Sequence, residues 1–260
     1  MRQLKTLYII GAGGFGREVA WLVERINRQS AEWDFKGFLD DDEKLWNTDL
    51  AGYRVYGGYP YIEKLNTDTW IAMAVGNANV RARGISRLAH LEHVHYATLI
   101  DPTVQMSGRI AVGEGTIICA GTLITVDVSI GRHNIINLDC TIGHDAVLED
   151  FVTLYPSVNI SGTVRIGTET ELGTGSQVIQ GIHIGNNTIV GAGATVIRDI
   201  ESNVTAIGTP ARVIKSHAPG GANNREEHKY YYIKQSEQYT KVQVAFFRGG
   251  SSRTCYGRAA

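Results

Sequence analysis

The sequence predicts an α/β domain with the first half of a Rossmann fold, followed by a parallel β-helix of hexapeptide repeats. Two observations predict this fold class. An aliphatic residue recurs at every sixth position from Val94 to Val196, and a glycine-rich segment near the N-terminus separates a predicted strand from a predicted helix. An α-helix cannot use a period of six, because its apolar face repeats every ~3.6 residues. We expect residues 1–90 to form the first domain, residues 91–215 the β-helix, and residues 216–260 a tail.

The six-residue repeat has eighteen positions, and each is isoleucine, leucine, valine or methionine. A second position four residues later is mostly small or apolar, as at Cys140, and Asn134 is its one awkward member. We expect each hexad to contribute one short strand and three hexads to close one coil, which makes six coils with the aliphatic side chains on the axis. Because no hexad can bury its side chain alone, the stack is the folding unit. An ordinary β-sandwich with chance spacing is the alternative.

The N-terminal residues have the pattern of a nucleotide site. Residues 6–10 predict a buried strand, Gly11 to Gly16 a tight turn, and residues 17–28 an amphipathic helix. Glycines let a ligand approach the backbone closely, and a helix N-terminus offers N–H groups to a phosphate. Two further strands, over 35–39 and 70–75, precede Asp40 and Gly76, and a carboxylate there can accept hydrogen bonds from ribose hydroxyls. A turn that only joins two elements is the alternative.

The predicted domain is too short for a complete dinucleotide fold. We expect three strands before the repeat begins and a helix over residues 81–89, whereas a full Rossmann fold has about six strands. Half of that fold suits a mononucleotide, such as the UDP of a nucleotide sugar, and NAD is the alternative ligand.

Composition excludes several classes of protein. A net charge of −1 argues against general affinity for nucleic acid or an anionic membrane. No apolar run reaches the ~18 residues of a membrane span, and the N-terminus runs directly into a strand, so we expect no signal peptide. Three cysteines without C-x-x-C spacing predict a cytoplasmic protein with no zinc motif.

Six segments carry a family resemblance: YIIGAGGFGRE, FLDDD, AVGN, NLDCTIGHDAVLED, IVGAGATVIRD and AIGTPARVIK. Over residues 5–215 the chain resembles the bacterial sugar acetyltransferases of the left-handed β-helix superfamily. It is most similar to the N-acetyltransferases of UDP-amino sugars, with sialic acid O-acetyltransferases as near relatives. The resemblance implies a homotrimer that transfers an acetyl group from acetyl-CoA to a nucleotide-linked amino sugar, with UDP as the expected nucleotide and without a metal.

The resemblance implies three catalytic residues. His144 corresponds to the general base, Asp145 to its acidic partner, and Gly162 to the residue whose backbone N–H holds the thioester oxyanion. The hexad phase agrees, because the third and fourth positions point outward and an imidazole beside a carboxylate is a suitable base near pH 7. His133 is a competing outward candidate without an adjacent acid, and a solvated histidine with no role is the alternative for His144.

The resemblance also implies the binding residues. It places acetyl-CoA in a groove between the coils of two subunits, at Thr174, Gly191, Ala192, Gly193 and Gly208. It places the nucleotide sugar at Gly13, Gly14, Phe15, Asp40, Asp41 and Gly76. Two residues depart from the family pattern, because close relatives often have histidine at the positions of Phe15 and Thr153.

Other classes of function stay open at this point. A zinc enzyme built on the same coils would need three converging histidines, and the cluster His90, His93 and His95 falls at the domain junction. A non-catalytic nucleotide-binding solenoid that assembles partners is a further alternative. For the tail we expect a polar linker over 216–229, and then one or two strands that either cap the last coil or form a loose end. An acetylation assay with acetyl-CoA discriminates among these functions.

Overall fold

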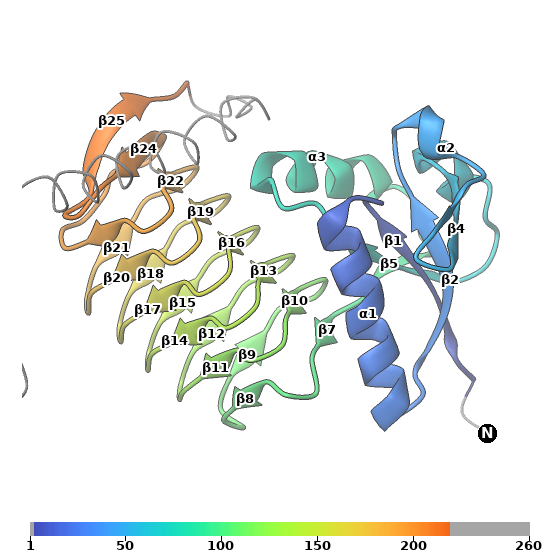
Figure 1. Cartoon of the computed structure of the whole chain (residues 1–260), viewed down its shortest axis with the longest axis horizontal. Helices are drawn as coiled ribbons and strands as arrows, with labels where there is room; N and C mark the ends of the chain where they lie inside the picture. Colours follow the sequence, from blue (N-terminus) through green and yellow to red (C-terminus); the bar gives the residue numbers. More distant parts are fainter. Residues whose placement is uncertain (1–2, 219–260) are drawn as a thin grey trace, which may run out of the picture. The chain divides into compact units, whose positions relative to one another are not determined.

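The structure, a computed structural model, describes residues 3–218 and confirms an α/β domain followed by a parallel β-helix (Figure 1). The chain beyond residue 218, including the two strands expected there and Cys255, lies outside the described residues. The elements of the first domain are β1 (Lys5–Ile10), α1 (Gly14–Gln29), β2 (Trp33–Leu39), a 3₁₀ turn (Glu43–Leu45), β3 (Asp49–Leu50), β4 (Tyr53–Gly57), α2 (Tyr59–Ile62), β5 (Thr69–Met73), α3 (Ala78–Leu88) and β6 (Val94–Tyr96).

The sheet of the first domain has six strands in the order β3-β4-β2-β1-β5-β6, so the expectation of three strands was wrong. The three expected strands are its centre, where Leu7 and Ile9 are completely buried. The missed strands are peripheral. In β4 only Val55 and Gly57 are buried, so the segment has no continuous apolar run. Val94 belongs to β6, which pairs with β5, so this residue begins no coil and the sheet extends past residue 90.

The β-helix has three faces, each a stack of parallel two-residue strands. The first face contains β7 (Leu99–Ile100), β10 (Ile117–Ile118), β13 (Ile135–Ile136), β16 (Thr153–Leu154), β19 (Glu171–Leu172), β22 (Ile189–Val190), β24 (Val204–Ile207) and the antiparallel β25 (Arg212–Ser216). The second contains β8 (Gln105–Met106), β11 (Leu123–Ile124), β14 (Thr141–Ile142), β17 (Asn159–Ile160), β20 (Gln177–Val178) and β23 (Thr195–Val196). The third contains β9 (Ala111–Val112), β12 (Ser129–Ile130), β15 (Val147–Leu148), β18 (Arg165–Ile166) and β21 (His183–Ile184).

The aliphatic residues of the repeat form the axis of the β-helix, as the six-residue period predicts. From Ile118 to Val196 each is at most 3% exposed, and together they make one apolar cluster. Met106 in the first coil is 37% exposed, because no coil lies beneath it. Asn134 is tolerated at an inward position because its Oδ1 accepts a hydrogen bond of 2.6 Å from the N–H of Val152 in the next coil.

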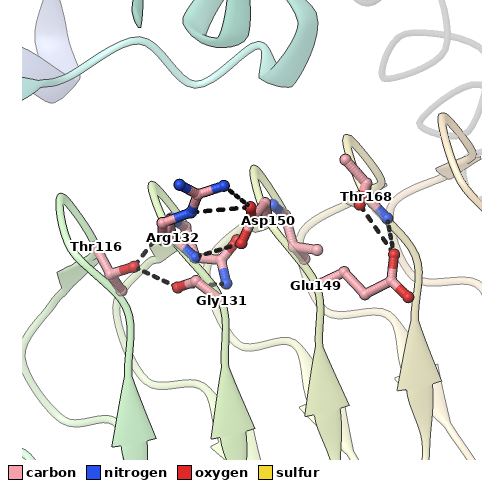
Figure 2. A network of polar contacts seen from close by, with 8 residues as sticks. Thr116, Gly131, Arg132, Glu149, Asp150 and Thr168 are labelled. Atoms are coloured by element: carbon pink, nitrogen blue, oxygen red, sulfur yellow. Dashed lines mark hydrogen bonds and ion pairs between the residues drawn. The ribbon is translucent and has the colours of Figure 1, made fainter.

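Polar side chains connect successive coils at the corner between the third and first faces (Figure 2). Arg132 donates from its backbone N–H and its guanidinium to Asp150, at 2.7 and 2.9 Å. The Thr116 hydroxyl donates to the carbonyl of Gly131, and Glu149 accepts from the N–H and hydroxyl of Thr168. These contacts satisfy backbone groups that the turns leave without a strand partner.

The first domain packs on the first face of the β-helix. Leu99, Ile117 and Ile135 point outward from this face and are still at most 1% exposed, whereas Leu123 on the second face is exposed. Leu99 and Ile117 share an apolar cluster with residues of β1, α1 and β2. This packing brings the loop after β5 against the coils of the β-helix. Within residues 3–218, no helix has the length and apolar character needed to cross a membrane.

Candidate active site

His144 lies at the corner between the second and third faces, directly after β14. Its side chain is half exposed, and its Nδ1 lies 2.8 Å from Oδ2 of Asp145. Asp145 has a φ of +58°, which turns its carboxylate back toward the preceding imidazole. With a proton on Nδ1 directed to the carboxylate, Nε2 keeps its lone pair and can accept a proton from a substrate. The outward position predicted for this pair is confirmed.

Gly162 lies one coil further along, at the same corner. A Cβ atom built on Gly162 would overlap Nε2 and Cε1 of His144, so only glycine permits the imidazole to lie against this backbone. Among the described residues, no acceptor takes the N–H of Gly162. A backbone N–H beside the basic nitrogen is therefore open to an oxyanion.

The five residues expected to bind acetyl-CoA gather at a different corner, between the first and second faces. The carbonyl of Thr174 accepts a hydrogen bond of 2.8 Å from the N–H of Gly193, and the carbonyl of Gly193 accepts one from the hydroxyl of Thr209. Gly208 precedes Thr209 and has a φ of +98°. A Cβ atom on Gly173 would lie 2.5 Å from the backbone nitrogen of Ala192, after Gly191, so consecutive coils approach closely here.

One chain therefore does not bring the whole predicted site together. The catalytic pair follows a strand of the second face, whereas Thr174 and Ala192 follow strands of the first face. The two groups lie at separate edges of the same β-helix.

The glycine-rich turn meets the end of β2 as predicted. The Asp40 carboxylate accepts a hydrogen bond of 2.7 Å from the N–H of Ala12. Gly13 and Gly14 have open space around them, so a ligand can reach the backbone there. Gly16 has a different reason for being glycine, because a Cβ would overlap the carbonyl of Gly11. The start of α1 thus presents backbone N–H groups beside a carboxylate, an arrangement suited to a phosphate and a ribose.

The other three residues expected to bind the nucleotide occupy distinct places. Asp41 follows Asp40, and its carboxylate lies against Gly58. Phe15 is half buried and packs on the apolar cluster between α1 and the sheet. Gly76 follows β5 and lies beside the β-helix, where a Cβ would be 3.4 Å from the hydroxyl of Tyr155. The C-terminal ends of β2 and β5 both lie beside the glycine-rich turn, because β1, which precedes that turn, pairs with both strands.

His133 is buried, so the expectation of an exposed candidate base at this position was wrong. Its ring is 5% exposed and packs between Phe151, stacked at 5.2 Å, and Tyr96. Burial, with smaller contributions from the charges of Arg81 and Arg132, lowers the pKa of His133 from 6.5 to about 4. Within residues 3–218, its buried Nδ1 has no hydrogen-bond partner. The packed first domain covers a position that the hexad phase alone places on the surface.

Sequence reasoning missed a buried polar network between α3 and the β-helix. Arg81 is 1% exposed, and Glu171 on the first face is equally buried. Glu171 accepts hydrogen bonds from the N–H of Ala78 and the hydroxyl of Tyr155. The one signal in the sequence is an acidic residue at a hexad position of this face where the neighbouring coils have Thr153 and Ile189.

Comparisons with known proteins agree with this architecture. Residues 6–88 match the family model described as the PglD N-terminal domain. A curated relative, UDP-N-acetylbacillosamine N-acetyltransferase from Bacillus subtilis (strain 168), is 39% identical over 121 residues, which are 45% of this chain and 52% of that protein. The chain spans about half the length of the curated relatives it matches.

Two solved structures match along nearly their whole length. The acetyltransferase domain of PglB from Neisseria gonorrhoeae FA1090, in complex with acetyl coenzyme A, is 28% identical with a TM-score of 0.74, over 82% of this chain and 100% of that one. A variant of perosamine N-acetyltransferase from Caulobacter crescentus, in complex with CoA and GDP-perosamine, is 30% identical with a TM-score of 0.71, over 82% and 99%. The chain therefore belongs to the hexapeptide-repeat sugar acetyltransferase family, and its N-terminal part matches the PglD N-terminal domain.

Proposed function

We propose that this protein transfers the acetyl group of acetyl-CoA to the amino group of a nucleotide-linked sugar, with His144 as general base. The observation that carries the proposal is the arrangement of His144 between Asp145 and Gly162. It supplies an oriented base and an adjacent N–H donor at one exposed corner. The related proteins of known structure, one with acetyl coenzyme A and one with CoA and GDP-perosamine, support both substrates.

The reaction needs no covalent enzyme intermediate. The amine nitrogen attacks the thioester carbonyl carbon while Nε2 of His144 takes the proton from that nitrogen. The C–N bond forms, the N–H of Gly162 stabilises the oxyanion, and the C–S bond breaks with its electron pair leaving on sulfur. The Asp145 carboxylate stabilises the imidazolium. Cys140 is completely buried, and burial raises the pKa of its thiol to about 12, so it is unsuited to be a nucleophile.

The nucleotide is proposed to bind where the glycine-rich turn meets Asp40. Open backbone at Gly13 and Gly14 suits a diphosphate, and the carboxylate suits ribose hydroxyls. A UDP-linked sugar is our first candidate, because the relative that is 39% identical is named for a UDP-sugar. GDP-linked sugars are tested as well, because the related perosamine N-acetyltransferase was solved with GDP-perosamine. We also propose a cytoplasmic location, because three cysteines without C-x-x-C spacing suit a reducing compartment.

We propose a homotrimer because the two halves of the site lie at different corners of one β-helix. Threefold packing can place the His144 corner of one subunit against the Thr174 corner of its neighbour. Exposed apolar side chains on the second face and the His144 corner support such an interface: Leu123, Val126, Ile179 and Ile197. A fully active monomer in light scattering at micromolar concentration would contradict the trimer.

The experiment that tests the function is a thiol-release assay with acetyl-CoA. Acceptors are UDP-linked and GDP-linked amino sugars, their hydroxyl analogues, and sialic acid. We expect CoA release only with a nucleotide-linked amino sugar, together with a product heavier by one acetyl group in mass spectrometry. Release with sialic acid alone would replace the proposal with O-acetylation, and the absence of acceptor-dependent release would contradict it.

A further inference from the structure

The guanidinium of Arg81 joins α3 of the first domain to two coils of the β-helix. Its Nε donates to the carbonyl of His133 at 2.8 Å, and its Nη2 donates to the carbonyl of Phe151 and the hydroxyl of Thr153, each at 2.9 Å. Burial lowers the pKa of Arg81 to about 10, which leaves the side chain charged at neutral pH. A charge this deeply buried is costly unless its donors are satisfied, and here the partners are almost all backbone carbonyls.

The same guanidinium binds the loop that follows β5. Its Nη1 donates to the carbonyl of Val75 at 2.6 Å and to that of Gly76 at 3.1 Å. The hydroxyl of Thr153 donates to the carbonyl of Gly76 at 2.8 Å. Gly76 is thus held by one side chain from its own domain and one from the β-helix.

The residues after Gly76 are held in a similar way. The side chain of Asn77 caps α3 by accepting from the N–H of Val80, and Glu171 of the β-helix accepts from the N–H of Ala78 at 2.9 Å. The hydroxyl of Tyr155, which faces Gly76, donates to the same carboxylate. Both sides of the Gly76 loop are therefore anchored on coils of the β-helix.

Docking of the two domains does not by itself require this network. The apolar cluster of Leu99 and Ile117 with the first domain already joins them. A separate contact, the ion pair between Arg25 on α1 and Asp101 directly after β7, spans the same interface at 2.6 and 3.0 Å without contacting the Gly76 loop. Arg81 differs from Arg25 in that its hydrogen bonds end on a loop assigned to the nucleotide site.

We infer that Arg81 and Thr153 form a positioning pair that holds the Gly76 loop in the geometry required for nucleotide binding. This inference rests on the proposed function. Neither side chain is assigned a contact with the reacting atoms. Their role is to make nucleotide affinity depend on coils of the β-helix, so that the substrate is presented in a fixed position relative to the catalytic corner.

The test compares four variants in titrations with UDP and GDP. Thr153→Val removes the hydroxyl but keeps the shape, and Thr153→Ser restores the hydroxyl. Arg81→Lys keeps the charge but loses the forked donors, and Arg25→Lys is the matched control at the Arg25–Asp101 ion pair. We expect Thr153→Val to raise the nucleotide Kd about 3- to 10-fold and Arg81→Lys at least about 10-fold. Thr153→Ser and Arg25→Lys should stay within about twofold of wild type, and the KM for acetyl-CoA should not change.

Hydrogen exchange over residues 74–80 provides a second readout. Exchange should accelerate in Arg81→Lys and Thr153→Val but not in Arg25→Lys, whose effect is limited to the interface. If Arg81→Lys fails to fold, the comparison of Thr153→Val with Thr153→Ser still tests the positioning role. If Thr153→Val binds the nucleotide as tightly as wild type, the positioning role is contradicted, but the proposed function is not. A wild-type protein that binds neither UDP nor GDP would contradict the proposed substrate, and with it the role of this pair.

Discussion

At the scale of single residues, hexad phase predicts orientation but not coverage. His144 is exposed where the phase places it. Asp145 contacts it as the next residue in the chain, and Gly162 contacts it from the following coil. His133 also has an outward phase, but it is buried, because Tyr96 of the first domain and Phe151 of the next coil pack against its ring. The orientation of a side chain follows from its own hexad, whereas its exposure depends on a domain that is distant in the sequence.

Replacing Gly162 with alanine should displace the catalytic imidazole. The added Cβ would overlap Nε2 of His144, so the base must move from its position beside the N–H donor. We expect a loss of kcat of about 10- to 100-fold, because a small displacement of a reacting group is costly. Gly108→Ala is the control, since a Cβ there meets open space at the same corner of an earlier coil. Steady-state kinetics and the melting temperature check both variants, and a kcat within twofold of wild type would contradict the role of Gly162.

His133 should make stability depend on pH in the acidic range. The unfolded chain protonates this imidazole near its ordinary pKa of 6.5, whereas the folded protein protonates it only near 4. The stabilisation is therefore present above pH 6.5 and is lost as the pH falls toward 4. Between pH 7 and 4.5 we expect the free energy of unfolding to fall by about 2 to 3 kcal/mol more in wild type than in His133→Phe. Urea denaturation measures this difference, and parallel losses in the two proteins would refute it.

At the scale of elements, the sequence predicts those that have a strong period or a long apolar run. The coil strands, β1, β2 and the glycine-rich turn all belong to this group. The strands β3, β4 and β6 could not be predicted, because they are short peripheral strands stabilised by pairing with a sheet that already exists. Val94 belongs to β6 and matches the six-residue period only by chance. The period of a repeat does not show at which residue the repeat begins.

The contact between the end of β2 and the glycine-rich turn leads to a prediction at this scale. Asp40→Ala removes both a proposed ribose acceptor and the partner of the Ala12 N–H. We expect the KM for the nucleotide sugar to rise about 10-fold or more with little change in kcat, because the lost interaction is the same in ground and transition states. Asp42→Ala, whose carboxylate only caps the following 3₁₀ turn, is the control. An unchanged KM in Asp40→Ala, or NAD binding in place of UDP binding, would overturn the assignment.

At the scale of the whole molecule, the structure joins a nucleotide-binding sheet to one face of a β-helix and leaves the other two faces exposed. The sequence predicts both parts but not their contact, because Arg81, Thr153 and Glu171 are polar residues whose partners in the other domain lie 52 to 93 residues away. The same limit applies to the two halves of the proposed site. The repeat shows that His144 and Thr174 lie at different corners of the β-helix. Only packing of several subunits can bring such corners together.

Direct acetyl transfer with His144 as base is the central claim, and the kcat of His144→Ala tests it most directly. General-base removal costs about 10²- to 10⁴-fold in rate, and an exposed side chain supports no core, so we expect that loss of kcat with an unchanged melting temperature. Asp145→Asn should lose less, and Cys140→Ala should keep its kcat. A His144→Ala variant that retains more than half of the wild-type kcat, or an acetylated Cys140 trapped by mass spectrometry, would contradict the account.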